Sequence, residues 1–447
     1  MNCRRGVLAI IVFLLVAALQ ISQPGHSQSL SSLRKIDVEA GKAMLKMLKS
    51  ELEKNFYDPT YHGTDPEARF KVAEDKLGQA QSLGHVYGIV GQPLLELNDP
   101  HTFFLPPPRN ARLDYGFQFQ MIGDSSFIVA TRPASDAEKK GLKPGDELLS
   151  IDGYKLTRGN LWKLTQIYYL LRPGSTPTLI VRTPEGQEKK YTPSPKVTQN
   201  SPILNYETSS NGRIDTKNLI NWIIDEGRRR KHRFHDEGDD LIIWNMPHFD
   251  IDESTLSGFM RSVKAKKALI LDLRNNPGGR EEILEGLAGM FFEKDTKIVD
   301  FKGRKEFKPL TAQGQGDSCF KGTVVAIVDS TTSGAAELLA RMLQIEKRGK
   351  VIGDITAGST MKATLHRYDL GENPFAASIS DALSVMSDGQ TLERAGVIPD
   401  EKLLPTAQDL AARRDPLITR AAEMIGFKID PGAAGGFFPP EWEALWR

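Results

Sequence analysis

Cysteine is nearly absent from this chain, which has two in 447 residues. Cys3 lies ahead of an apolar run near the N-terminus, so it is not placed as a lipid-anchor cysteine after that run. Removal of the run as a signal would leave only Cys319 and would exclude an internal disulfide. The folded chain must then be stabilised by core packing.

An excess of charge of either sign is also missing. The chain has 58 Lys and Arg against 57 Asp and Glu, a net charge of +1, which gives no reason to expect a nucleic-acid partner. One basic run, residues 228–233, has acidic neighbours on both sides and is typical of a solvated loop or helix end. The sequence predicts no metal and no cofactor, because no His/Cys cluster has metal-ligand spacing and no glycine-rich loop matches a phosphate cradle.

Long apolar runs are limited to one, Val7 to Leu19. Arg4 and Arg5 precede this run, and Gly25 and Ser27 supply small residues at cleavage spacing, as in a secretory signal. The run is short for a bilayer span, which needs about 20 residues. We expect a cleavable signal peptide over residues 1–27, a periplasmic or secreted protein, and no stable membrane span after cleavage. The alternative is an uncleaved N-terminal membrane anchor.

The length predicts two or three domains. The patterns along the chain change in the following order: a helical region at 33–110, a β-rich module at 113–195, a polar connector at 196–239, an α/β domain at 240–430 and an extension at 431–447. Gly, Pro and Trp are frequent in the extension, which we expect to pack irregularly. Leu219–Ile224 suggests one helix in the connector.

The β-rich module is indicated by alternation and by turns. Phe117, Phe119 and Met121 alternate as in a half-buried strand, and Lys143–Asp146 is a turn with Pro and Gly in favoured places. A helix at Leu161–Leu171 and a last strand at Thr178–Thr183 complete this unit.

The α/β domain is indicated by short apolar runs that alternate with helical patterns. The predicted strands are Leu241–Asn245, Ala268–Leu273, Val324–Val328 and Lys350–Gly353, and the predicted helices are Glu281–Phe292 and Ala335–Leu343.

Two strand-to-loop junctions of this domain could carry chemistry. Gly278 and Gly279 follow the strand that ends near Leu273, and paired glycines allow close backbone approach and free N–H groups for an oxyanion. Ser333 lies just before the helix that contains Glu337, where the helix dipole favours negative charge. Taken alone, the first junction is a tight turn and the second a helix cap.

A serine nucleophile needs a base and an orienting group. His101 lies in a chain break at 98–102, and Glu393 precedes the segment 396–400 by three residues. Each residue by itself is more often a solvated surface group.

Five segments in order resemble the tail-specific, or C-terminal processing, serine peptidases. They are Asn98–Thr102, Gly141–Asp146 with Ile151–Gly153, Ala268–Gly279, Val324–Asp354 and Gly396–Asp400. The resemblance covers roughly residues 33 to 427. It implies an α/β, crotonase/ClpP-like protease core with an inserted β-rich PDZ domain and an N-terminal helical segment. It implies serine endopeptidase activity on polypeptide C-termini, and it implies that Tyr115, Gly116 and Phe117 form the loop that binds a peptide carboxylate.

The family uses either a Ser–Lys dyad or a tricorn-like Ser, His and Glu set. Ser359 occupies the position of the dyad lysine in this chain, and Lys362 is the nearby substitute. His101 and Glu393 fit the positions of the His type, so the resemblance favours the tricorn-like branch with His101 as base.

The family places its nucleophile three residues before the helix glutamate, and that position is Gly334 here. Two explanations follow. Either Ser333 acts as the nucleophile after the turn shifts by one residue, or this chain has lost the nucleophile. In the first case, Gly278 or Gly279 together with the N–H of Gly334 forms the oxyanion hole.

The sequence therefore predicts a serine peptidase that takes polypeptide substrates or C-terminal peptides. The alternative is a catalytically dead, PDZ-containing pseudopeptidase that binds peptides or a partner protease. A weaker third reading is an envelope structural protein. The oligomeric state stays open.

Overall fold

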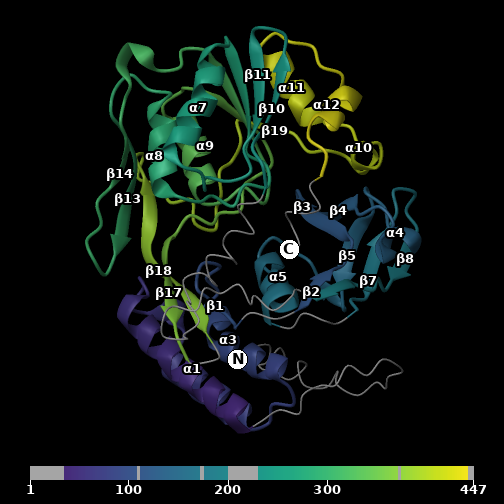
Figure 1. Cartoon of the computed structure of the whole chain (residues 1–447), viewed down its shortest axis with the longest axis vertical. Coiled ribbons are helices and arrows are strands. Elements are labelled where there is room, and N and C mark those ends of the chain that lie inside the picture. Colours follow the sequence, from purple (N-terminus) through teal and green to yellow (C-terminus); the bar gives the residue numbers. More distant parts are fainter. Residues whose placement is uncertain (1–34, 108–110, 172–175, 200–229, 371–373, 441–447) are drawn as a thin grey trace, which may run out of the picture.

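The computed structural model describes residues 35–107, 111–171, 176–199, 230–370 and 374–440. Figure 1 shows three parts: N-terminal helices at the bottom, a β-rich module to one side and a larger α/β core at the top. The expected signal peptide and the helix expected at Leu219–Ile224 lie outside the described residues. Within the described ranges, no helix is long and apolar enough to cross a membrane.

The N-terminal part is a helical layer. It consists of α1 (Lys35–Asn55), α2 (Pro66–Leu77) and α3 (Leu83–Glu96). Asp65 caps α2 and Ser82 caps α3, each accepting a backbone N–H of the first turn. The leucines that repeat at helical spacing in α1, Leu48 and Leu52 among them, are fully buried and share a core with Phe375 of the adjoining sheet.

The β-rich module, residues 111–199, is a twisted sheet with short helices. Its strands are β3 (Phe117–Ile122), β4 (Ser125–Thr131), β5 (Glu147–Ile151), β6 (Tyr154–Lys155), β7 (Leu179–Arg182) and β8 (Glu188–Tyr191), in the order β3-β4-β5-β7-β8, with β6 on β5. The remaining elements are α4 (Asp136–Lys139), α5 (Leu161–Thr165), the π-turn η2 (Gln166–Leu171) and the ribbon of β2 (Ala111–Asp114) with β9 (Lys196–Gln199). The strand expected at 178–183 is β7, but it is followed by β8, so it is not the last.

The core of the α/β domain is a six-stranded sheet. Its order is β10 (Arg233–Glu237), β11 (Leu241–Asn245), β12 (Ala268–Asp272), β15 (Thr323–Val328), β16 (Lys350–Gly353) and β19 (Glu401–Lys402), parallel from β11 onward. Alternate strand residues point to opposite faces. One face packs on α7 (Glu253–Lys264), α8 (Glu281–Gly289) and α9 (Ala335–Ile345), and the other packs on α11 (Pro416–Met424) and α12 (Pro431–Phe437).

Two expected boundaries need correction. The connector was expected to run to residue 239, but its last residues form β10, because Phe234 packs against the buried Trp244 with ring centroids 5.4 Å apart. The C-terminal extension was expected to be irregular, but it begins with α12, whose first turn Asp430 caps. A short helix, α10 (Ala407–Ala411), precedes α11.

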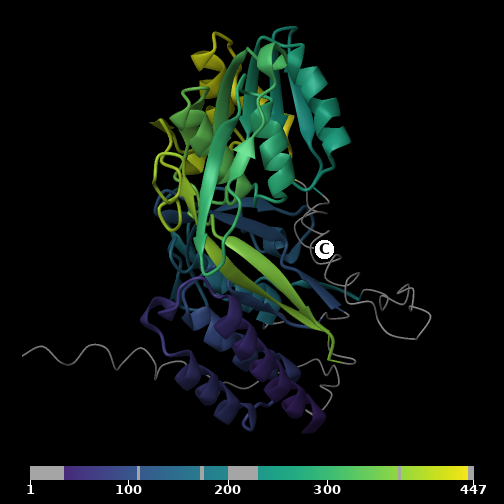
Figure 2. The ribbon, with the colours of Figure 1, turned by 90° about the vertical axis from the view of Figure 1, so that its left-hand side faces the viewer.

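A second, antiparallel sheet connects the core to the helical layer. It contains β1 (Phe103–Leu105), β18 (Phe375–Met386), β13 (Thr296–Gly303) and β14 (Leu310–Ala312), and β17 (Lys362–Tyr368) also pairs with β18. Figure 2 shows these long strands descending from the core toward the helices. The sequence did not predict this sheet.

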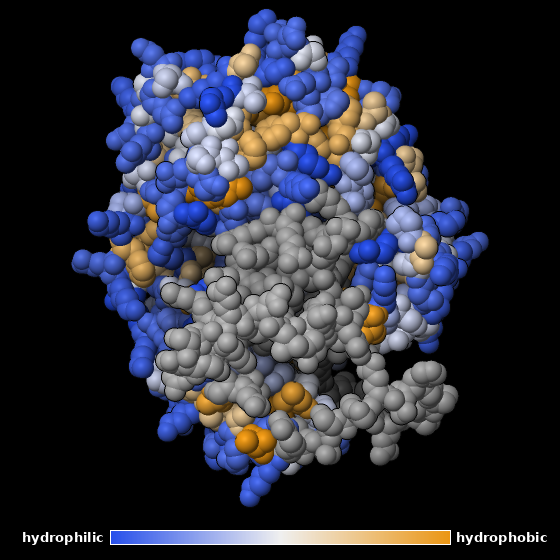
Figure 3. Space-filling view, in the orientation of Figure 1, coloured by the Kyte–Doolittle hydropathy of each residue, from blue (hydrophilic) through white to orange (hydrophobic). Residues whose placement is uncertain are grey.

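Apolar side chains are mostly inside. Hydrophilic residues predominate on the face drawn in Figure 3, with scattered apolar patches over the core. Cys319 is a buried free cysteine, so packing holds the described fold together without a disulfide at this residue.

Candidate active site

Three loops meet where the parallel strands of the core end. We call them the glycine loop (residues 273–280, after β12), the α9 loop (329–334, after β15) and the Ser359 loop (354–361, after β16). Their strands are neighbours in the order β12-β15-β16, so the loops lie side by side. The carboxyl ends of parallel strands are the usual place for a site in an open α/β sheet.

Ser359 and His101 come together at this edge. The Ser359 Oγ lies 2.8 Å from the His101 Nε2, although the two residues are 258 positions apart in sequence. This is hydrogen-bond distance between a hydroxyl and an imidazole, the contact that a nucleophile makes with its base. The sequence pattern had marked Ser359 only as the position of a missing lysine.

Strand pairing explains this meeting. β18 pairs with β1 on one side and with β17 on the other. Thr102, next to His101, accepts the backbone N–H of Ser380 through its hydroxyl at 3.1 Å, and Ser380 pairs with Ala363 of β17. The central strand therefore aligns the segment before β1 with the loop before β17.

Glu393 is the third member of the cluster. Its Oε2 lies 3.8 Å from the His101 Nε2 and accepts the backbone N–H of Thr360 at 2.8 Å. The carboxylate and the Ser359 hydroxyl thus face the same imidazole nitrogen, whereas a usual triad places them on opposite nitrogens. At 3.8 Å, the Glu393 carboxylate is within ion-pair distance of His101 but beyond hydrogen-bond distance.

The charge states suit proton transfer. Burial lowers the pKa of His101, with the charge of Asp99 acting in the opposite direction, so the imidazole is neutral at pH 7 and can accept a proton. Burial raises the pKa of Glu393 to about 7, and the nearby carboxylates of Asp99 and Glu337 act in the same direction. Glu393 is therefore only partly ionised near neutral pH.

Glu337, fully buried in the first turn of α9, holds the Ser359 loop. Its carboxylate accepts the N–H of Gly358 at 2.8 Å, of Ser359 at 2.9 Å and of Gly334 at 3.2 Å, and also accepts the hydroxyl of Thr356. Burial raises its pKa to about 7. One side chain thus fixes the backbone at Ser359 and at the start of α9.

Ser333, the expected nucleophile, is not the hydroxyl that meets the base. Its N–H donates to the carbonyl of Asn276 at 2.8 Å, and, within the described chain, His101 hydrogen-bonds through its ring to Ser359 alone. Ser333 as the nucleophile stays a prediction; in the structure, the hydroxyl that contacts His101 is that of Ser359. The reason is that the partner of His101 is selected by the pairing of β1 and β17 with β18, which the local pattern around Ser333 does not contain.

Gly334 begins α9 with a left-handed backbone, φ 58°. A Cβ at this position would contact the carbonyl of Pro277 at 3.4 Å and the Cα of Gly278 at 3.6 Å, which are ordinary contact distances. A larger residue would therefore fit the space but strain the backbone.

The expected oxyanion donors are engaged inside the protein. The N–H of Gly278 donates to the Asn276 side chain at 2.8 Å, and that of Gly334 donates to the carbonyl of Ser359 at 2.9 Å. An oxyanion would have to replace these acceptors. Gly278 and Gly279 both have positive φ, 89° and 139°, and a Cβ on Gly278 would lie 2.9 Å from the nitrogen of Ala335. Glycine at this position therefore lets the glycine loop pack closely against the start of α9.

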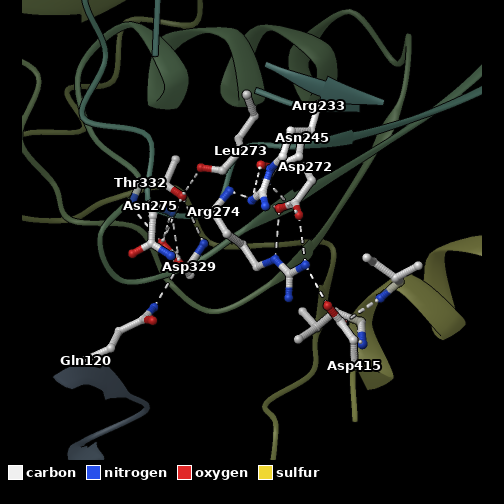
Figure 4. Close-up of polar contacts among 12 residues, drawn as sticks. Gln120, Arg233, Asn245, Asp272, Leu273, Arg274, Asn275, Asp329, Thr332 and Asp415 are labelled. Atoms are coloured by element: carbon white, nitrogen blue, oxygen red, sulfur yellow. Dashed lines mark hydrogen bonds and ion pairs between the residues drawn. The ribbon is translucent and has the colours of Figure 1, made fainter. Parts of the chain in front are cut away.

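A partly buried arginine, Arg274, anchors the glycine loop. Figure 4 shows Arg274 between Asp272 and Asp415; it donates twice to Asp272 at 2.8 Å and once to Asp415 at 2.7 Å. Such charge-assisted forks are rigid.

Asp329 anchors the α9 loop in a similar way. It accepts the N–H groups of Thr331 and Thr332, each at 2.9 Å, and the side chain of Gln120 at 2.8 Å (Figure 4). Because Gln120 lies on β3, this bond also joins the β-rich module to the core.

Lys362, the substitute for the dyad lysine, turns away from Ser359. Its Nζ pairs with both oxygens of Glu281, at 2.6 and 2.8 Å, and lies 4.7 Å from the ring centre of Phe301. The ammonium group of Lys362 is thus engaged by Glu281 in the structure.

The expected carboxylate-binding loop is tightly packed. Tyr115 and Phe117 are 3% exposed, and the N–H of Gly116 donates to Asp114 at 2.9 Å. A Cβ on Gly116 would lie 2.4 Å from that of Ser135, so the loop is built against α4. β3, which follows the loop, is an edge strand of its sheet.

The module is joined to both serine-bearing loops. Ser330 of the α9 loop donates its hydroxyl to the carbonyl of Met121 on β3. Arg158 of the module donates to the carbonyls of Gly123, at 2.8 Å, and of Ile355 in the Ser359 loop, at 2.9 Å, and pairs with Asp354. A cluster of three or more His, Cys, Asp or Glu that could hold a metal is not found in the described ranges.

Comparison with known proteins shows what the α/β core is similar to. The family model described as Peptidase family S41 matches residues 243–403, which include the three loops and both Glu337 and Glu393. This region is therefore similar to the peptidases of family S41. His101 lies outside the matched residues, and it reaches the S41 core through β1.

Curated relatives extend this match. The chain is 24% identical over 330 residues to a "Carboxyl-terminal-processing protease" of a Picosynechococcus species, covering 70% of this chain and 72% of that protein. It is 23% identical over 341 residues to "Carboxy-terminal processing protease CtpA" of Bacillus subtilis, covering 74% of this chain and 65% of that protein. These names are consistent with a serine peptidase.

A solved structure shares the fold. Mature CPAF superposes with a TM-score of 0.62 at 16% identity, covering 84% of this chain and 95% of that one. The similarity therefore includes the helical layer and the module as well as the S41 core.

Proposed function

We propose that this protein is a serine peptidase that cleaves polypeptides, with Ser359 as the nucleophile and His101 as the base. The observation that carries the proposal is the distance of 2.8 Å between the Ser359 Oγ and the His101 Nε2. A neutral, partly buried imidazole in this position can take the hydroxyl proton at neutral pH. The S41 core supplies the chemical context.

The reaction would follow the acyl-enzyme route. The Ser359 Oγ bonds to the carbonyl carbon of the substrate while its proton passes to His101. The C–N bond then breaks, and His101 returns the proton to the leaving amine. Water hydrolyses the acyl-enzyme by the same proton path. Glu393, at 3.8 Å, stabilises the imidazolium when the carboxyl is ionised.

The decisive experiment is degradation of an unfolded model protein by the purified chain and by two serine variants. We expect Ser359→Ala to abolish cleavage and Ser333→Ala to retain it within about twofold, because only Ser359 contacts the base. The opposite pattern would return the role to Ser333 and contradict this assignment.

A second candidate function is a peptide-binding pseudopeptidase. It is favoured by the N–H groups around Ser359: those of Gly358 and Ser359 donate to Glu337, and that of Thr360 donates to Glu393. An oxyanion at Ser359 would therefore lack nearby backbone donors. Under this candidate the wild-type chain binds peptides without turnover, and Gly334→Ser, which places a hydroxyl at the family position, creates activity.

We also propose that the β-rich module is a PDZ domain that binds peptide C-termini by adding them to the edge strand β3. The edge position of β3 supports this. The bonds from Gln120 and Met121 to the α9 loop leave the Tyr115 end of the strand as the place where a peptide would begin to pair. Hydrogen exchange should show protection of Phe117–Phe119 when a C-terminal peptide is added, and no change there would contradict the proposal.

The location outside the cytoplasm is a further part of the proposal. It rests on the charged start and the apolar run of residues 4–19. Cell fractionation with N-terminal sequencing tests it: a mature chain that begins near residue 28 in the periplasm or medium supports it, and an intact N-terminus in the membrane fraction supports an anchor instead.

A further inference from the structure

The turn that carries His101 follows directly on helix α3, and the last carbonyls of a helix have no partner inside it. Asn98 takes a left-handed backbone in this turn, with φ 57°. After it, the Asp99 carboxylate accepts the N–H of His101 at 2.9 Å and the hydroxyl of Thr102 at 3.1 Å. The carbonyls of Leu97 and Asn98, before the base, are held instead by donors from two other segments.

His62 supplies the first donor, from the helical layer. Its Nδ1 lies 2.9 Å from the carbonyl of Leu97. A carbonyl can only accept a hydrogen bond, so Nδ1 carries the hydrogen and Nε2 is left to accept the hydroxyl of Tyr57, 2.7 Å away. The backbone of His62 is left-handed, with φ 55°, and its N–H donates to Asp58 at 2.8 Å. These contacts hold the imidazole in place against the turn that precedes the base.

Arg394 supplies the second donor, and it also reaches the serine side of the site. Its guanidinium donates to the carbonyl of Asn98 at 3.1 Å and lies 3.4 Å from the ring of His62. A cation is favoured here because the carbonyls at the end of a helix carry partial negative charge. The backbone N–H of Arg394 donates to the carbonyl of Gly358, next to Ser359, at 2.7 Å. One residue thus bridges the turn of the base and the Ser359 loop.

Backbone strain accompanies this bridge. His62, Asn98 and Arg394 have φ values of 55°, 57° and 63°, a conformation that residues other than glycine rarely adopt. Gly358 has φ 66°, and a Cβ there would lie 2.8 Å from the carbonyl carbon of Arg394. Strained backbone persists where the surrounding contacts over-determine it, and it is concentrated at functional sites. The packing therefore fixes the turn of the base against the loop of the nucleophile.

We propose that His62 and Arg394 are positioning residues for the base. By holding the turn before His101 against the Ser359 loop, they set the contact of 2.8 Å between the imidazole and the reacting hydroxyl. The proposal rests on the proposed function, because it takes Ser359 as the nucleophile. The contribution belongs to kcat rather than to KM, since a displacement of about 1 Å between reacting groups can cost about 100-fold in rate.

The test uses variants of the full chain whose new residue suits a left-handed backbone. Arg394→Gly removes the guanidinium and keeps the backbone N–H to Gly358. His62→Asn removes the imidazole and introduces a residue that tolerates this conformation. We expect each variant to lower kcat about 10- to 100-fold with KM within about twofold, and to slow the reaction of Ser359 with a fluorophosphonate by a similar factor. The midpoint of thermal unfolding should change little, because strain is relieved as the hydrogen bond is lost.

The controls separate positioning from general stability. Arg413→Gly removes another exposed arginine with a left-handed backbone, φ 53°, and should leave kcat within about twofold. Arg394→Lys keeps a cationic donor and should lose less than Arg394→Gly. Guanidinium ion, added far below the concentrations that unfold the chain, should raise the kcat of Arg394→Gly and leave that of Arg413→Gly unchanged. The double variant at His62 and Arg394 should lose less than the product of the single losses, since both act on one turn.

Unchanged kcat in either Arg394→Gly or His62→Asn would overturn the proposal, and so would an equal loss in Arg413→Gly. A loss that follows the unfolding midpoint and that guanidinium does not reverse would also overturn it, because the two residues would then act on stability alone. Failure of the proposed function looks different: the fluorophosphonate would label Ser333, or no serine, in the wild-type chain.

Discussion

The α9 loop and the Ser359 loop are adjacent, each carries a serine, and yet they differ in what holds them. Their strands pair in parallel, Val328 opposite Gly353. The α9 loop is anchored by Asp329, by the glycine loop and by the β-rich module. The Ser359 loop is anchored by Glu337 and Glu393 and is contacted by His101. One loop matches the position where the family carries its nucleophile, and the other contacts His101.

This difference shows that a helix start and small residues do not by themselves define a nucleophile. A hydroxyl becomes reactive where an imidazole lies against it, and His101 is delivered by a strand far away in sequence. The predictions below compare the two loops through matched changes, from the largest expected effect to the smallest.

Loss of the base should have the largest effect after loss of Ser359 itself. His101→Asn removes the proton acceptor at 2.8 Å from the Ser359 Oγ and should lower kcat about 1,000-fold. Initial rates of peptide cleavage measure it. His235→Asn, a change of the same kind on β10, should leave the rate within about twofold. If both variants cleave alike, the contact between His101 and Ser359 is not catalytic.

The next largest effect should come from the carboxylates that anchor the two loops, and it should be larger for Glu337 than for Asp329. Glu337→Ala leaves buried N–H groups at Gly358 and Ser359 unsatisfied, so kcat/KM should fall roughly 100-fold and the unfolding free energy by about 3 kcal/mol. Asp329→Ala disturbs the other loop and should lower kcat/KM less than about tenfold. Thermal unfolding of each variant separates a displaced serine from a lost fold. A larger loss of activity in the Asp329 variant would assign the chemistry to the α9 loop.

The pH dependence should report on Glu393, whose pKa burial raises to about 7. The carboxyl loses its proton as pH rises through this value, so support of the imidazolium, and with it kcat/KM, should increase from about pH 6 to about pH 8. Glu393→Gln should flatten this profile, with the greater loss above pH 7. Glu337 titrates in the same range and would leave a residual slope. An unchanged profile in the variant would exclude Glu393 from the reaction.

The same carboxyl affects stability in the opposite sense. The folded chain binds this proton more tightly than the unfolded chain, in which the pKa of the glutamate is near 4.5. Stability should therefore fall as pH rises from about 4.5 to about 7. The slope is at most about 1.4 kcal/mol per pH unit for one group. Denaturant unfolding at several pH values should show a shallower fall for Glu393→Gln than for the wild type.

The smallest effect on activity is expected at Gly334. Gly334→Ala places a Cβ at ordinary contact distance but on a left-handed backbone with φ 58°, so the unfolding free energy should fall by about 1–2 kcal/mol. Cleavage through Ser359 should remain within about twofold. A loss of activity far beyond this would mean that the start of α9 takes part in the reaction.

Much of the fold could be predicted from the sequence because its signals are local. Buried apolar runs indicated β11, β12, β15 and β16, and turn residues indicated the module. The exceptions are β10, α12 and the sheet around β18. β10 is a polar edge strand in a hairpin with β11, and β18 forms a hairpin with β17 but pairs with β1 and β13 across long sequence separations. The pairing of β18 with β1 and with β13 depends on contacts that no window of sequence contains.

The sequence by itself determined the α/β core, the glycine loop, and His101 and Glu393 as candidates, since strand patterns, paired glycines and ordered motifs are readable one segment at a time. Only the tertiary structure decided that Ser359 rather than Ser333 meets His101, and that Lys362 is committed to Glu281. The physical reason is that a site is defined by distances between side chains. These distances depend on the register of β1 and β17 against β18, which forms only when the whole sheet is assembled.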